Sequence, residues 1–240
     1  MAIKSYTLYK MMVRLIIFGP PGAGKGTYSA KLEKILGITK ISTGDVLREE
    51  VKRRTELGVK IEKYLEKGVL VPDDIVIEIV KREILRASPR GFILDGFPRN
   101  LYQAKALEKI TTIDAIINLL IPEEILIEKL LGRRICSRCG EIYNVANIDR
   151  IIDGIRYLLP PLTPQREGVC DKCGGPLIMR EDDKVEVIKR RLRVYKEYSE
   201  PIIEYYRSKG LEFIDILVNR EPEVIVRRIV NALKSRGLLT

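Results

Sequence analysis

The sequence predicts an α/β fold, a doubly wound parallel sheet interrupted by an inserted segment, and three observations support this prediction. Short apolar runs at 14–18, 92–95 and 115–120 are typical of strands buried on both faces of a parallel sheet. Segments with helical periodicity separate these runs, and such alternation favours right-handed crossover connections. Residues 134–179 break the alternation, because they hold all four cysteines and four of the twelve prolines.

The remaining elements follow from the same patterns. Pro72 is predicted at the first position of a helix, because apolar residues recur behind it at 75, 79 and 80. Pro122 is predicted to open another helix that runs to about residue 133. The other helices are expected over 26–36, 43–54, 59–67, 182–209 (with Ile188, Leu192, Tyr195 and Ile202 on one face) and 221–236, and a last strand over 211–216.

Composition limits the class of protein. The chain has 240 residues, of which 45% are apolar and 32% charged, a balance typical of a globular domain. No apolar run reaches the roughly 18 residues that a membrane span needs. Residues 1–12 lack the apolar core and small-residue cleavage site of a signal peptide, so we expect a cytoplasmic protein. This segment is either a short arm or the product of an upstream start codon, with Met11 and Met12 as the other starts. The net charge of +10 suits nucleic acid, an anionic surface or a phosphate-rich substrate without choosing among them.

A glycine-rich loop follows the first strand and opens a helix. Its residues are Gly19, Pro20, Pro21, Gly22, Ala23, Gly24, Lys25, Gly26 and Thr27. This order of strand, loop, lysine and helix is the context that a phosphate-binding P-loop requires, since backbone N–H groups and the helix N-terminus surround an anion. The alternative is a glycine-rich turn without a ligand, and the order of strand, loop, lysine and helix stands against it. Gly26 stands where the general pattern has Ser or Thr, and Thr27 comes one residue later, which weakens direct Mg²⁺ ligation by the loop.

Four further segments extend a resemblance to the adenylate kinases, in family order and at family-like spacings. They are Ser42 to Arg48, Gly91 to Arg99, Gly132 to Arg134, and Arg180 to Asp183 with Arg190 to Leu192. The resemblance covers roughly residues 12–236 and is more specific than the P-loop alone. It implies a P-loop NTPase-type doubly wound parallel sheet with an inserted helical AMP-binding subdomain and a zinc-binding lid subdomain. It also implies Mg²⁺-dependent, reversible transfer of a phosphoryl group from ATP to AMP, giving two ADP.

The resemblance assigns boundaries and site residues. The core domain would comprise 12–41, 72–133 and 180–240, the AMP-binding subdomain 42–71 and the zinc lid 134–179. The implied catalytic residues are Lys25, Asp95, Arg99, Arg133, Arg180 and Arg191. The implied ATP-binding residues are Gly22, Ala23, Gly24, Lys25, Gly26, Thr27, Lys129 and Arg133. The implied AMP-binding residues are Thr43, Arg48, Val69, Leu70, Val71, Gly96, Arg99, Gln103, Arg180 and Arg191.

These residue types suit phosphoryl transfer. The transition state is loose and spreads charge over the transferred oxygens, so the protein supplies position and positive charge rather than a nucleophile. The absence of histidine is therefore no objection. Each cation could instead be a solvated surface charge, and Arg190 and Arg193 are rivals of Arg191 on the same helix. Asp95 resembles the acid that orients Mg²⁺, although a strand-end cap or an arginine partner are alternatives. Asp182 and Asp183 could pair with the lid arginines or simply favour a helix N-terminus.

The acceptor side selects among kinases. Gln103 can present both a donor and an acceptor to an adenine edge, and with Thr43 it resembles the AMP-specific pattern. The alternative for Gln103 is a surface position on a helix. A sister nucleoside monophosphate kinase is the rival among enzymes. A nucleic-acid-binding P-loop ATPase is the rival of another class, against which stands the absence of an aromatic-rich basic stripe near the cysteines.

Two C-x₂-C pairs point to a metal. Cys136 and Cys139 form one pair, and Cys170 and Cys173 form the other. Four thiolates supplied by two tight turns suit tetrahedral Zn²⁺, and four protein ligands make such a site structural rather than catalytic. Two disulfides or free thiols are the alternatives. Residues 147–166, between the pairs, have no clear family counterpart and could pack the lid or form a subunit contact. The resemblance implies a monomer, with an oligomer left open.

Overall fold

A computed structural model describes residues 12–87 and 89–239, so the predicted N-terminal arm lies outside the described residues. The central sheet has five parallel strands in the order β10-β4-β1-β3-β2. Its strands are β1 (Val13–Phe18), β2 (Thr39–Ser42), β3 (Gly91–Asp95), β4 (Ala115–Leu120) and β10 (Glu212–Leu217). The predicted doubly wound α/β fold is therefore confirmed.

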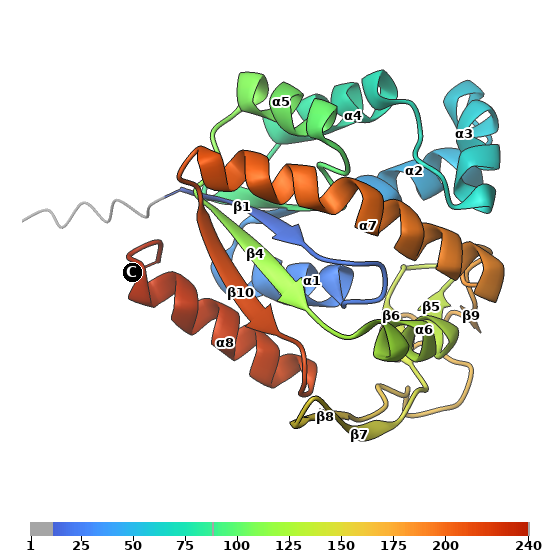
Figure 1. Cartoon of the computed structure of the whole chain (residues 1–240). Helices are drawn as coiled ribbons and strands as arrows, with labels where there is room; N and C mark the ends of the chain where they lie inside the picture. Colours follow the sequence, from blue (N-terminus) through green and yellow to red (C-terminus); the bar gives the residue numbers. More distant parts are fainter. Residues whose placement is uncertain (1–11, 88, 240) are drawn as a thin grey trace, which may run out of the picture.

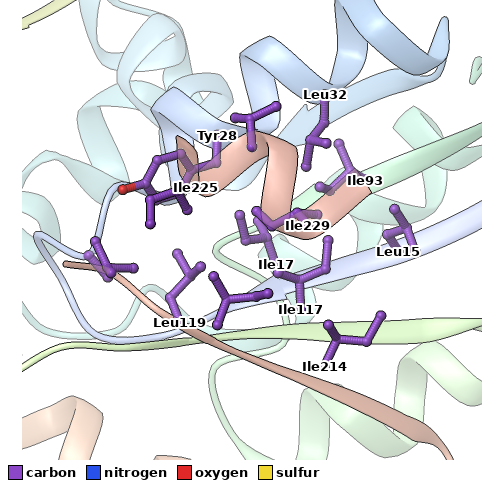
Figure 2. Close-up of a cluster of buried hydrophobic side chains, with 14 of the residues drawn as sticks. Leu15, Ile17, Tyr28, Leu32, Ile93, Ile117, Leu119, Ile214, Ile225 and Ile229 are labelled. Atoms are coloured by element: carbon purple, nitrogen blue, oxygen red, sulfur yellow. The ribbon is translucent and has the colours of Figure 1, made fainter. Parts of the chain in front are cut away.

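Helices cover both faces of this sheet (Figure 1). Helices α1 (Lys25–Leu36) and α8 (Pro222–Ser235) lie on one face, and α4 (Asp73–Leu85), α5 (Leu101–Ile110) and α7 (Val185–Ser208) lie on the other. Figure 2 shows the first interface, where Ile17 and Ile117 of the strands pack against Leu32 of α1 and Ile229 of α8. Side chains of the strands are buried on both faces of the sheet, which explains the continuous apolar sequences of these strands.

Several boundaries differ from the predictions for local reasons. Pro72 and Pro122 cap their helices from outside rather than occupying the first helical position, because their ψ angles of 134° and 149° are extended. Their carbonyls nevertheless accept the first helical hydrogen bonds, from Val76 and Leu126. Helix α6 (Glu123–Leu131) ends before Arg133, which already belongs to a strand. Strand β2 and helix α5 were not predicted. For β2 the reason is that a four-residue strand carries little periodic signal.

Two inserts lie beyond the carboxyl ends of the strands (Figure 1). The first consists of α2 (Thr43–Lys52) and α3 (Glu56–Lys67). The second holds a three-stranded sheet of β5 (Arg133–Cys136), β6 (Ile142–Asn144) and β9 (Leu177–Ile178). It also holds a hairpin of β7 (Ile148–Ile152) and β8 (Ile155–Leu159), in a segment for which the sequence predicts no element. None of the described helices is long and apolar enough to cross a membrane.

Candidate active site

The glycine-rich loop connects β1 to α1 at the carboxyl end of the sheet. Gly22 and Gly24 have φ angles of 86° and 96°, a left-handed conformation that favours glycine. A Cβ on Gly22 would lie 2.9 Å from Leu130 Cγ of α6, so a larger residue would collide with a packed side chain. The Lys25 Nζ donates to the carbonyls of Gly19 at 2.6 Å and Pro20 at 2.9 Å. The lysine thus lies over the loop that it would use to hold phosphate.

Burial lowers the pKa of Lys25 to about 7. Asp95 opposes this effect, and the nearby Arg99, Arg191 and Arg133 add to it. Burial also lowers the pKa of Arg99 to about 10 and that of Arg180 to about 9, again with arginine neighbours. Burial removes the water that would stabilise these crowded cations. A bound anion compensates for that loss by stabilising their positive charge, so the site favours an anion.

Asp95 is the carboxylate that faces the loop. It ends β3, its backbone pairs with Ile17 of β1, and its side chain is buried. Ser29 Oγ donates to Asp95 Oδ2 at 3.5 Å, and the same oxygen would lie 3.5 Å from a Cβ on Gly26. None of the ion pairs found among the described residues involves Asp95, which leaves the carboxylate available to a cation. A hard oxygen donor beside a phosphate loop fits Mg²⁺ bound partly through water and phosphate.

Arg133 and Arg191 pair with two acids that precede α7. Arg133 Nε donates to Asp183 Oδ2 at 2.8 Å, and Asp183 is fully buried. Arg191 lies 2.7 Å from an Asp182 oxygen and 3.5 Å from Asp183. The predicted pairing of these acids with arginine is therefore observed. Arg180 differs, because its buried Nε has no hydrogen-bond partner among the described residues and its nearest carboxylate contact, with Asp45, is 4.0 Å long.

Arg191 is separated from its two rivals by position. Arg191 lines the central cavity, whereas Arg190 is exposed and donates to the carbonyl of Lys67. Arg193 is also exposed. Of these three neighbouring arginines, the structure therefore directs Arg191 toward the site.

A cavity of about 230 Å³ extends along the loop. Every predicted ATP-binding residue lines it except Ala23, a fully buried residue of the loop. Lys129 is one of the lining residues, and burial lowers its pKa to about 8. Gly96, Arg99 and Arg180 line the same cavity.

A second cavity of about 50 Å³ opens beside the first. Its walls include eight of the ten predicted AMP-binding residues, namely Thr43, Arg48, Val69, Leu70, Val71, Arg99, Gln103 and Arg191. Gly96 and Arg180 line the larger cavity instead. Six residues line both cavities and so lie where the two spaces meet: Gly44, Arg48, Gly68, Leu70, Arg99 and Arg191.

Gln103 is buried rather than on the helix surface, which removes the alternative of a surface position. Its Oε1 accepts from the Arg99 backbone N–H at 2.8 Å, and its Nε2 donates to Asp73 Oδ1 at 2.7 Å. A primary amide has one more lone pair and one more N–H, so each end keeps one bonding position. The Thr43 hydroxyl donates to the Gly96 carbonyl at 2.9 Å, which leaves Thr43 only as an acceptor.

The four cysteines form one cluster. Their sulfur atoms all lie within 4.8 Å of one another, with Cys136 to Cys173 at 3.4 Å and Cys139 to Cys170 at 3.6 Å. Tetrahedral zinc with Zn–S bonds near 2.3 Å would space its sulfurs by about 3.8 Å. The cysteines are free thiols, not disulfides. The cluster fits a structural zinc ion, with no position left for substrate.

A second layer of contacts fixes the cysteine cluster. The Tyr143 hydroxyl donates to the Cys170 sulfur at 3.6 Å and accepts from the Asp171 backbone N–H at 2.8 Å. A Cβ on Gly175 would lie 2.8 Å from the Cys136 sulfur, so this position requires glycine. Such outer contacts orient metal ligands. The two turns that carry the cysteines are therefore held in place by neighbouring residues of the same insert.

Comparison with known proteins gives a consistent result. The family model for adenylate kinase matches residues 17–211. The adenylate kinase of Caldicellulosiruptor saccharolyticus is 49% identical over 83% of this chain and 89% of its own length. That of Caldicellulosiruptor bescii is 46% identical over 94% of this chain and its full length, and that of Archaeoglobus fulgidus is 46% identical over 83% and 88%. The chain belongs to the adenylate kinase family.

Adenylate kinases carry out the reversible conversion of ATP and AMP into two ADP with magnesium-bound nucleotide, and this is the reaction of the chain. Sequence reasoning did not include several residues that line the adenylate kinase cavity, namely Ile142, Ile148, Leu159, Pro160, Leu162, Arg220, Glu221 and Pro222. Most belong to the unassigned segment of the lid or to the loop before α8. A signal for the first group was present, because Asp153-Gly154 between alternating apolar residues is typical of a two-residue hairpin.

Proposed function

We propose that the larger cavity holds the donor ATP and the smaller cavity holds the acceptor AMP, with the transferred phosphoryl group at their junction. The proposal is supported by the six residues that line both cavities, three of which are arginines. Lys25 and the loop amides would hold the donor phosphates. Arg99 would bridge the acceptor and transferred phosphates, and Arg133, Arg180 and Arg191 would hold the ATP phosphates. Planar guanidinium groups suit this role, because they bind phosphate oxygens in pairs.

The chemistry requires little more than alignment and positive charge. An oxygen of the acceptor phosphate attacks the terminal phosphorus of the donor, and the bond from that phosphorus to the bridging oxygen breaks. The protein's cations stabilise the charge on the three oxygens in transit. Binding of the anionic donor would return Lys25 to its protonated form. Asp95 would hold Mg²⁺ through water, and the ion, when bound, neutralises charge on the donor phosphates.

The acceptor base would be selected by Thr43 and Gln103. Thr43 can only accept, whereas Gln103 keeps one donor and one acceptor. Adenine offers an amino donor beside a ring acceptor, which matches this set. A base with a carbonyl in place of the amino group would leave a buried polar atom unpaired, and such mismatches discriminate strongly. Leu70 and Val71 would wall the base.

We further propose the domain division into the core (12–41, 72–133 and 180–240), the AMP-binding subdomain (42–71) and the zinc lid (134–179). In the observed arrangement the two inserts touch, since Lys52 Nζ donates to the Ser137 carbonyl at 3.1 Å. Ile142 of β6 lies over the loop, 3.3 Å from the position of a Cβ on Gly26. Closure of this kind excludes water, which would protect the donor from hydrolysis.

A monomer acting in the cytoplasm completes the proposal. The two cavities already contain every predicted nucleotide-binding residue except Ala23, so the proposed site calls for no residue from a second copy. Four cysteines without a disulfide suit a reducing compartment. Sedimentation of the active enzyme would test the monomer directly.

The deciding experiment is an acceptor panel. Purified protein with ATP and Mg²⁺ is given AMP, CMP, UMP or GMP, and the diphosphate formed is measured. We expect strong product with AMP alone. The variant Arg99→Ala should lose about 3 kcal/mol of transition-state stabilisation, a factor of roughly 100 or more in kcat/KM. Arg193→Ala, an exposed arginine on α7, is the control.

Each other outcome of the panel has a distinct meaning. Preference for another acceptor would contradict the roles of Thr43 and Gln103. A near-normal rate in Arg99→Ala would contradict the role of Arg99. Hydrolysis of ATP without transfer to any acceptor, together with salt-dependent RNA binding, would favour a nucleic-acid-dependent ATPase.

A further inference from the structure

The chain itself holds the Gln103 amide from both ends. Its Oε1 accepts from the Arg99 backbone N–H at 2.8 Å, and its Nε2 donates to Asp73 Oδ1 at 2.7 Å. The side chain is buried and also lines the smaller cavity, which is the proposed site of the acceptor. The contacts that orient this amide therefore decide what it can present to an acceptor base.

The two partners determine which end of the amide is oxygen and which is nitrogen. A backbone N–H can only donate, and an ionised carboxylate can only accept. The Gln103 oxygen must therefore face Arg99, and its nitrogen must face Asp73. The reverse orientation would place donor against donor and acceptor against acceptor. Asp73 is the first residue of α4, and a helix N-terminus suits a negative charge.

Asn100 joins Asp73 to the start of α5. Its Nδ2 donates to Asp73 Oδ1, the same oxygen that accepts from Gln103, at 2.9 Å. Its own Oδ1 accepts from the Gln103 backbone N–H at 2.9 Å and so caps the helix on which Gln103 lies. One carboxylate oxygen thus holds both the first turn of α5 and the amide that this turn carries.

Asp73 itself lies outside the site, since it lines neither cavity. Among the described residues, two side chains donate to its carboxylate, those of Asn100 and Gln103. Of these two, Gln103 lines the smaller cavity, whereas Asn100 lines neither. The direct route from Asp73 to a bound acceptor is therefore through Gln103.

We propose that Asp73 is a positioning residue for selection of the acceptor base, acting through the Gln103 amide. The inference rests on the proposed function, in which the smaller cavity holds AMP. Once Arg99 and Asp73 are bonded, the amide keeps one lone pair on its oxygen and one N–H on its nitrogen. The order of these two groups is set by the anchors, and it matches the amino donor and ring acceptor of adenine.

A base with the reverse order of groups reveals what the anchor contributes. Hypoxanthine, the base of IMP, has a carbonyl and a ring N–H where adenine has an amino group and a ring nitrogen. It would require the Gln103 amide to be turned over, which the Asp73 carboxylate opposes. Loss of this carboxylate should therefore lower the preference for AMP over IMP.

The test compares Asp73→Ala with a matched control, Asp74→Ala. Both changes remove one acid from the first turn of α4, so their effects on the helix N-terminus are alike. Asp74 is exposed and lines neither cavity. With ATP as donor, kcat and KM are measured for AMP and for IMP, together with KM for ATP and thermal stability. Competitive inhibition by IMP against AMP defines the preference where turnover of IMP is slow.

We expect Asp73→Ala to lower the ratio of kcat/KM for AMP to that for IMP roughly 10-fold, as when a buried polar group loses its partner. The change should lie mainly in KM for AMP, with KM for ATP within twofold of the parent. Asp73→Asn should lose only about threefold, because its amide oxygen can still accept from Gln103. Asp74→Ala should match the parent in this ratio.

A double variant tests the route through Gln103. Gln103→Leu removes the amide but keeps a buried side chain of similar size, and it should itself lower the preference for AMP. Adding Asp73→Ala to Gln103→Leu should then change the ratio by less than twofold, because residues that act through one contact are not additive.

Three results would overturn the inference while leaving the proposed function intact. The first is an unchanged ratio in Asp73→Ala. The second is an equal loss of kcat/KM for AMP and for IMP with lower thermal stability, which would assign Asp73 a structural role alone. The third is a further 10-fold fall when Asp73→Ala is added to Gln103→Leu. Failure of the parent protein to phosphorylate AMP would instead contradict the proposed function, and the inference with it.

Discussion

The two halves of the segment 134–179 are stabilised in different ways. The cysteine half, with β5, β6 and β9, has a small apolar cluster of Cys136, Tyr143 and Cys170 with Leu177 packed against it. The hairpin half packs Tyr157 and its neighbours against α6 and β10 of the core. Little apolar surface is available to hold the first half together, so its metal supplies the stability that packing cannot. The second half needs no metal, because the core supplies its apolar partners.

This difference has a consequence for movement. A module held together from within can move as a unit, whereas a hairpin that packs on the core loses contacts when it moves. Arg133 and Asp183 lie where the cysteine half joins the core, and their ion pair is almost fully buried. We therefore expect the cysteine half to open and close over the phosphates while the hairpin half stays at the donor end.

The largest effect should come from removing a metal ligand. Cys170→Ser should lower the zinc content from one ion per chain toward zero and unfold the cysteine half. A loss of roughly 5 kcal/mol is well within the stability that structural zinc contributes, and it corresponds to roughly 10–20 °C in a chain of this size. Metal analysis and calorimetry measure both quantities, with Ser137→Ala as the control in the adjacent turn. Unchanged thermal stability at full zinc loss would contradict a structural role.

A smaller and more local effect should come from the hairpin. Tyr157→Ala removes a buried ring that lines neither cavity, at a cost of about 3 kcal/mol in docking. Zinc content should not change. Amide exchange of Leu158, whose N–H donates to Asn219, should accelerate roughly 100-fold, because local opening becomes that much more frequent. Equal acceleration of the amides around the cysteines would show that the two halves open together.

What the sequence could predict follows the same division. The loop from Gly19 to Thr27 and the two C-x₂-C pairs are local signals, since neighbouring residues supply all the chemistry. Their elements were therefore predicted, and the cysteines come together as expected. The sheet was predictable for a related reason, because strands buried on both faces have continuous apolar sequences. Short strands such as β2 carry no such signal.

Contacts between distant residues could not be predicted in this way. Nothing near Leu158 in the sequence indicates that its N–H pairs with Asn219, 61 positions later. The hairpin itself was within reach, since Asp153 and Gly154 adopt the positive φ angles of 49° and 76° that this turn favours. The sequence does not indicate which face of the hairpin packs on the core, because that depends on contacts with Ile125 and Leu217. Likewise, no pattern shows that the Gln103 amide already bonds Arg99 and Asp73.

The smallest expected effect is a change in the free energy of unfolding with pH. It tests which half of the insert keeps water away from the phosphate loop. Burial lowers the pKa of Lys25 to about 7, whereas the unfolded chain keeps the ordinary value of 10.5. Between these values the unfolded chain holds a proton that the folded, ligand-free enzyme has released. The free energy of unfolding should therefore rise with pH, by about 2 kcal/mol from pH 7 to pH 9. Lys129 titrates in the same direction, so the contribution of Lys25 is the part that disappears in Lys25→Met.

Ile142 of the cysteine half lies over the loop, so we expect that half to cause the dehydration of Lys25. Denaturant unfolding across this pH range should then show the Lys25-dependent rise in the parent and in Tyr157→Ala. Cys170→Ser should lose this rise in the free energy of unfolding, because water that reaches Lys25 returns the pKa of Lys25 toward its ordinary value. If Lys25→Met keeps the full rise of the parent, Lys25 is not its source. If Tyr157→Ala loses the rise and Cys170→Ser keeps it, the hairpin rather than the zinc module closes the site.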